Sequence, residues 1–133
     1  MKSKSLQILY WLPRVAGIAA ILFVSLFALD AFDPALSLWQ QWLAFMVHLT
    51  PTYVWVALLV LAWKRELVGG VLFVVVGLAF SPVIFLYQYQ LNHSLWISLR
   101  FVATLSLPFV VVGGFFLWHH FKKKFSKKKY QAQ

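Results

Sequence analysis

The chain has 133 residues, of which 62% are hydrophobic and only 11% are charged, and its formal net charge is +9. A soluble domain is typically about 45–50% apolar and about 25% charged, and so small a domain leaves much of its surface exposed. The composition therefore excludes an ordinary soluble protein and predicts an integral membrane protein. The absence of cysteine excludes disulfides, thiolate metal sites and cysteine nucleophiles.

Four apolar segments are long enough to cross a bilayer, because a membrane-spanning helix needs about 20 apolar residues. In chain order they are residues 10–29, 42–63, 67–87 and 95–118. Runs such as "VWVALLVLAW" are apolar on every side, whereas transmembrane β-strands would alternate. We therefore expect an all-α fold. It would be an integral membrane four-helix bundle over residues 1–121, followed by a disordered basic tail over residues 122–133.

Basic residues gather at alternate ends of these segments. Lys2 and Lys4 precede the first segment, Lys64 and Arg65 lie in the second connection, and the C-terminal tail holds six lysines. The first and third connections hold no lysine or arginine. Because cytoplasmic loops carry the excess of basic residues, both termini are expected in the cytoplasm. This predicts a multi-pass membrane protein whose two ends lie on the cytoplasmic side.

A polar side chain lies in the outer third of each predicted helix. The rise of about 1.5 Å per residue places these groups about 6–9 Å below the outer edge of the membrane. The residues at this depth are Ser25, His48, Ser81 and Arg100. Thr52 shares a helical face with His48. The five side chains could therefore form an outward-facing polar pocket.

Of the side chains in that pocket, Arg100 has the largest free-energy cost of placement in the membrane. An arginine costs about 2.5–3.5 kcal/mol at the centre of a span, and less near the edge. Asp30 and Asp33 are the only acids on the outer side, so they are the expected ion-pair partners. The alternative is that Arg100 extends its side chain to the lipid headgroups.

The other acid, Glu66, begins the third segment directly after the second connection. A carboxylate at this position suits the positive end of the helix. We expect Glu66 to act as a cap and as a charge partner for Lys64 or Arg65.

The sequence contains no pattern that indicates an enzyme. No acid lies deep in a predicted span, and neither "HExxH" nor "GxSxG" occurs. We therefore predict no catalytic residue, no metal and no cofactor. A haem needs two facing histidines, and His48 with His93 is the only pair on the outer side of the membrane, so haem binding through His48 stays an alternative.

The lysines of the tail are expected to contact anionic lipids at the cytoplasmic face. Each charge near the surface contributes about 1 kcal/mol to such binding. The residues are Lys122, Lys123, Lys124, Lys127, Lys128 and Lys129. The alternative is a signal that only stops and orients the last span. No nucleic-acid partner is predicted.

Three classes of function remain open. The leading one is a non-enzymatic membrane component, either an accessory subunit of a larger complex or a small homo-oligomer. The second is a small transporter or channel whose pocket surrounds His48 and Arg100. Four-span multidrug exporters resemble the chain in size, but they rely on a glutamate in the first span, and none lies there. The third is a haem- or quinone-binding redox subunit.

Two stretches resemble a family of small bacterial four-span membrane proteins whose domain has no known function. They are "LPRVAGIAAILFVSLFALDAFD" and "HLTPTYVWVALLVLAWKRELVGGVLFVVVG", and the likeness covers roughly the first 80 residues. The shared pattern consists of Arg14, Asp30, His48, Pro51, Thr52, Trp63, Glu66, Gly69 and Gly70. The resemblance implies the same four-helix architecture and supplies no activity or catalytic residue.

Overall fold

The structure is a computed structural model that describes residues 4–131 and consists of helices joined by short connections. The elements are α1 (Lys4–Leu26), the 3-10 helix η1 (Phe27–Ala31), α2 (Leu38–His48), α3 (Thr50–Lys64), α4 (Glu66–Asn92), α5 (Leu95–Leu105) and α6 (Leu107–Gln131). The described residues contain no strand. The expectation of an all-α fold is confirmed.

Several of these helices have the length and composition of membrane spans. Within the described residues, Lys4–Ala31, Glu66–Asn92 and Leu95–Lys129 are each long and apolar enough to cross a membrane. Helices α2 and α3 pass the same test only as a pair, which is bent by 41° at a short break. The structure therefore has three helices, or four if the bent pair is one span, that are long and apolar enough to cross a membrane, which is consistent with a multi-pass membrane protein.

Proline explains the two breaks within the predicted spans. Helix α2 gives way to α3 at Leu49, two residues before Pro51, and α5 gives way to α6 at Ser106, two residues before Pro108. Proline lacks an N–H donor and its ring clashes with the preceding turn, so a helix tends to break or kink just before it. By contrast, Pro82 lies inside the continuous helix α4.

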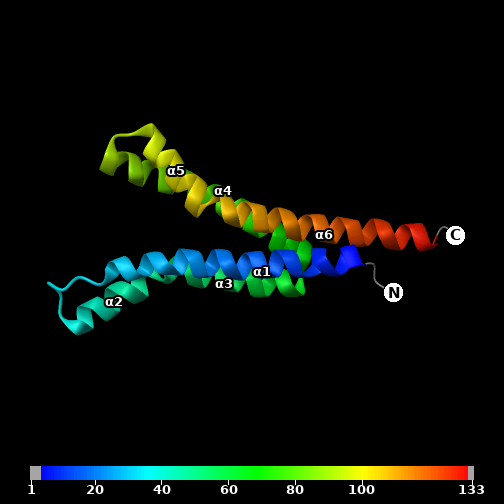
Figure 1. Cartoon of the computed structure of the whole chain (residues 1–133), viewed down its shortest axis with the longest axis horizontal. Coiled ribbons are helices and arrows are strands. Elements are labelled where there is room, and N and C mark those ends of the chain that lie inside the picture. Colours follow the sequence, from blue (N-terminus) through cyan, green and yellow to red (C-terminus); the bar gives the residue numbers. More distant parts are fainter. Residues whose placement is uncertain (1–3, 132–133) are drawn as a thin grey trace.

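Four helices form the body of the bundle. Helix α1 packs against α3 and α6, and α4 packs against the same two helices, so these four close into a ring. Figure 1 shows that the start of α1 and the end of α6 lie at the same end of the molecule, which we call the closed end.

At the opposite end the chain divides into two arms. One is the α2 arm, residues 27–48, which continues from α1 through η1 to α2. The other is the α5 arm, residues 83–105, which consists of the last turns of α4 and all of α5. The two arms diverge in Figure 1, where the α2 arm is cyan and the α5 arm is yellow-green.

The core between the ring helices is a stack of aromatic side chains. The ring of Trp55 in α3 stacks on that of Phe109 in α6, with centroids 3.7 Å apart, and on that of Phe73 in α4 at 5.5 Å. Phe73 also stacks on Phe116 at 6.1 Å. Phe73, Phe109 and Phe116 are completely buried. Large apolar rings contribute much of the packing energy of such a core.

The C-terminal tail differs from its prediction. Helix α6 continues to Gln131, so the tail is helical rather than disordered over its described part. Residues 115–131 contain neither glycine nor proline, and lysine is a good helix former. Lysines in the last turn also suit the negative end of the helix. The six lysines therefore occupy fixed faces of one helix.

Candidate functional site

Three ionisable side chains from three helices meet at the closed end. The guanidinium Nη2 of Arg14 in α1 donates to Glu66 Oε1 at 3.1 Å, and Nδ1 of His119 in α6 lies 3.0 Å from Glu66 Oε2. Glu66 is the first residue of α4, so one carboxylate joins α1, α4 and α6. The side chains of Arg14 and His119 are 1% and 5% exposed, and that of Glu66 is 12% exposed. We call these residues the Arg–Glu–His cluster.

Aromatic rings enclose the guanidinium of Arg14. The ring of Tyr10 lies 3.6 Å from the guanidinium carbon, and those of Trp63 and Phe116 each lie 5.6 Å from it. The negative faces of such rings attract a cation. Arg14 also donates through Nη1 to the carbonyl oxygen of Tyr10. Its buried Nε has no hydrogen-bond partner in the described part of the chain, so the cluster holds one unsatisfied donor.

The tight connection between α3 and α4 places Glu66 in this position. Helix α3 ends at Lys64, and Arg65 alone separates it from α4. Gly69 packs so closely on Ala62 that a Cβ on Gly69 would lie only 2.1 Å from the Ala62 Cα. Only glycine permits so close an approach. The first turn of α4 is thereby held against α3.

Glu66 therefore has other partners than those predicted. Lys64 and Arg65 are exposed, and the ion pairs among the described residues join Glu66 to Arg14 and His119. The physical reason is burial: a charge pair in water gains little, whereas a buried guanidinium requires a carboxylate. Sequence reasoning named Arg14 only as part of the shared family pattern and assigned no role to His119.

The Arg–Glu–His cluster acts as a structural link between helices. Both carboxylate oxygens of Glu66 already have partners, and the three side chains are largely buried. Residues 4–131 contain no group of three or more His, Asp or Glu side chains that could hold a metal ion. The cluster stabilises one arrangement of α1, α4 and α6.

The structure does not gather the predicted polar pocket into one place. His48 is exposed on α2, where its Nδ1 lies 2.9 Å from the carbonyl oxygen of Ala44. Thr52 is buried on α3, and Ser25 Oγ donates to the carbonyl oxygen of Ile21 in its own helix. His93, the other histidine considered for haem, is the C-cap of α4 on the α5 arm, whereas His48 lies on the α2 arm.

Ser81 belongs to a different polar contact. Its Oγ lies 2.7 Å from Ser106 Oγ and 3.1 Å from the carbonyl oxygen of Gly77, to which Ser106 Oγ also donates. Ser106 is the residue at which α5 gives way to α6, so this contact fixes the base of the α5 arm on α4. The sequence signal for Ser106 was its position two residues before Pro108, which sequence reasoning did not use.

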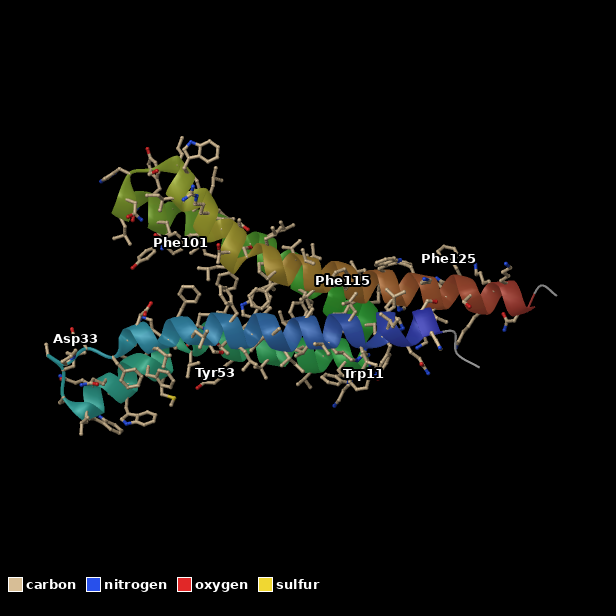
Figure 2. The ribbon with its side chains drawn as sticks, in the orientation of Figure 1. Trp11, Asp33, Tyr53, Phe101, Phe115 and Phe125 are labelled. Atoms are coloured by element: carbon tan, nitrogen blue, oxygen red, sulfur yellow. The ribbon has the colours of Figure 1, made fainter. Side chains whose placement is uncertain are left out.

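Arg100 stands alone in the structure. It is exposed on α5 and makes no ion pair or hydrogen bond with another described residue. The predicted pairs with Asp30 and Asp33 are not formed, because the acids lie on the α2 arm and Arg100 lies on the diverging α5 arm. In Figure 2, Asp33 marks the tip of the first arm and Phe101, next to Arg100, marks the second.

The lysines of α6 divide into two faces. His120, Lys123, Lys124 and Lys127 line a shallow hollow of about 380 Å³. Their spacings of three, four and seven residues place them on one helical face. Lys122 and Lys129 lie on the opposite face by the same period. Several cations on one face can contact a single phosphate group, whereas isolated lysines attract a membrane only through their summed charge.

These two faces yield a matched prediction. We expect K123Q/K127Q to weaken binding to anionic phospholipid in mixed micelles by about 2 kcal/mol, the sum for two lysines near the surface. K122Q/K129Q removes the same net charge and should cost less than half as much. Cosedimentation of the purified protein in mixed micelles with labelled lipid would measure both affinities. Equal losses would show that only net charge matters.

The fold and the site define a class of small all-helical protein with three or four membrane-length helices, a buried charged cluster at one end and two arms at the other. Within that class the chain belongs to the DUF7670 family, a domain of unknown function whose model matches residues 1–129. This match extends well beyond the first 80 residues in which the resemblance was noted. Comparison with curated proteins and with solved structures found no match.

Proposed function

We propose that the protein is a non-enzymatic subunit of the bacterial inner membrane that acts by assembling with other membrane chains. In this proposal it crosses the membrane four times, with both termini in the cytoplasm and the tail lysines on anionic lipid. One observation carries the proposal: Arg100 lies among exposed apolar side chains and has no ion-pair or hydrogen-bond partner among residues 4–131. The difference between the two ends of the molecule also supports the proposal.

At the centre of the closed end the charged side chains are paired with one another, and only the Nε of Arg14 has no partner among the described residues. The Arg–Glu–His cluster joins three helices there, and the close packing of Gly70 on Gly113 joins α4 to α6. Membrane helices associate through small residues and buried polar contacts of this kind. This end is therefore suited to hold the subunit together.

The α5 arm has the opposite character. The extensive contacts of helix α5 with other elements are those with α4 and α6. Its large apolar side chains are exposed, including Leu95, Trp96 and Leu99. Lipid satisfies such side chains, but an arginine among them is costly unless it finds an anion. A neighbouring membrane chain could supply one.

The orientation follows from the lysine distribution. The start of α1 and the end of α6 lie at the closed end, and the basic turn between α3 and α4 contributes Glu66 to the cluster there. Because basic residues favour the cytoplasmic side, the closed end would face the cytoplasm and the two arms would face outward.

The proposal predicts an assembly of fixed stoichiometry. Native mass spectrometry of protein purified in a gentle detergent should show the chain in a complex, either with itself or with a defined second subunit. R100Q should reduce the complex by about tenfold or more, whereas R65Q, at the closed end, should leave it unchanged. A monomer in both detergent and lipid nanodiscs would contradict the proposal. Specific flux of an ion or solute in proteoliposomes would favour a transporter instead.

A further inference from the structure

The charges on the two arms are opposite in sign, and none of them forms an ion pair with another described residue. Arg100 is exposed at the middle of α5, about 7–8 Å along the helix from Leu95. The chain has only three acids, and Glu66 is already paired at the closed end. The acids available to Arg100 in this protein are therefore Asp30 and Asp33.

Asp30 is the better placed of the two. It lies in η1, at the end of the candidate span Lys4–Ala31, and it is exposed without a hydrogen bond or ion pair to another described residue. Asp33 lies in the following loop, where its Oδ1 accepts from the backbone N–H of Ala35 at 2.9 Å. The local bond engages one oxygen of Asp33 and ties its side chain to the loop, whereas both carboxylate oxygens of Asp30 can accept from a guanidinium.

We infer that the α5 arm of one copy docks on the α2 arm of a second copy, with Arg100 of each copy paired to Asp30 of the other. This inference rests on the proposed function and names its partner. The two arms of one chain diverge, so the pair does not form within the chain (Figure 1). A two-fold axis along the membrane normal keeps both copies in the same orientation and forms two identical contacts.

The trans pair accounts for the position of both charges. A guanidinium and a carboxylate bond in a bidentate fork, and a membrane environment strengthens that contact relative to water. The alternative occupants of the α5 arm are a lipid phosphate reached by the extended Arg100 side chain, and a different membrane protein. Neither would depend on Asp30.

A charge-reversal experiment separates trans from cis pairing. R100E alone places two carboxylates opposite each other in both contacts, and D30K alone places two cations opposite each other. Each variant should therefore dimerise at least about tenfold more weakly than wild type. A chain carrying only R100E and a differently tagged chain carrying only D30K should nevertheless form a heterodimer together. Both contacts in that heterodimer join opposite charges, and no cis pair is restored by mixing two chains.

The readout is native mass spectrometry and tag-specific pull-down after coexpression. D33K is the matched control, because it makes the same charge change three residues away and should keep the wild-type dimer. Melting curves of all variants in detergent establish that each monomer remains folded. Dimers of R100E or D30K alone, or failure of the mixture to form the heterodimer, would overturn the inference.

The outcome for wild type distinguishes this inference from the proposed function. A complex with a second subunit of fixed stoichiometry, without self-association, would overturn the trans pair and leave the proposed function standing. A wild-type monomer in detergent and in nanodiscs would overturn both.

Discussion

Replacing Glu66 with glutamine is expected to lower the free energy of unfolding by about 3 kcal/mol, the lower end of the range for breaking a buried ion pair. The substitution keeps the shape of the side chain and removes its charge. It leaves the guanidinium of Arg14, which is 1% exposed, without a carboxylate. The loss arises mainly from that uncompensated buried charge.

Reversible unfolding in mixed detergent micelles would measure this change. Arg65→Gln is the matched control, because Arg65 is the adjacent exposed residue and its loss should change the free energy by no more than about 0.5 kcal/mol. Equal effects of the two substitutions would show that the Arg–Glu–His cluster is not a structural tie.

A double substitution tests the cause of the loss. Arg14→Met with Glu66→Met replaces the charged pair by apolar side chains, and such replacements of a buried pair are often neutral or stabilising. We therefore expect the double variant to be more stable than Glu66→Met alone. If the double variant is less stable than Glu66→Met alone, the loss of stability arises from altered packing rather than from the unpaired charge of Arg14.

Gly113→Ala is expected to cost about 1–3 kcal/mol, because it overpacks the contact between α4 and α6. A Cβ on Gly113 would lie 2.7 Å from the carbonyl oxygen of Gly70 and 2.9 Å from Phe73 Cβ. The backbone oxygen cannot move without shifting its helix. A small residue at this point is what allows the two helices to approach so closely.

The next residue supplies the control for that prediction. A Cβ on Gly114 would meet nothing within 4 Å, so Gly114→Ala should be tolerated and should gain up to about 1 kcal/mol from helix propensity. The same unfolding measurement serves both variants. If the two substitutions have the same sign of effect, the close approach of α4 and α6 is not what makes Gly113 necessary.

Much of the helical framework was predictable because it depends on local composition. The segment 67–87 corresponds to α4, and Pro51 and Pro108 each lie two residues after the break in their span. Gly70 and Gly77, both within that segment, lie at its contact with α6. By contrast, the helical continuation of the tail was missed, because high charge was taken to indicate disorder although no residue there breaks a helix.

The candidate site was less predictable, because it depends on how helices are rotated against one another. Arg14 and Glu66 are 52 residues apart and Glu66 and His119 are 53 apart, so no local spacing links them. A usable signal was present: all three lie at the cytoplasmic ends expected for their spans. Glu66 was assigned to Lys64 and Arg65 because sequence proximity took precedence over burial.

The sequence by itself determined that the chain is helical and rich in membrane-length apolar segments, because the hydrophobic demand of each segment is set by its own residues. Only the tertiary structure decided which polar groups meet. It buried Arg14 against Glu66, joined Ser81 to Ser106 and left Arg100 on an arm apart from Asp30. Side-chain partners depend on the packing of glycines and aromatic rings between distant helices. The residues of a single apolar segment do not indicate which other segment packs against it.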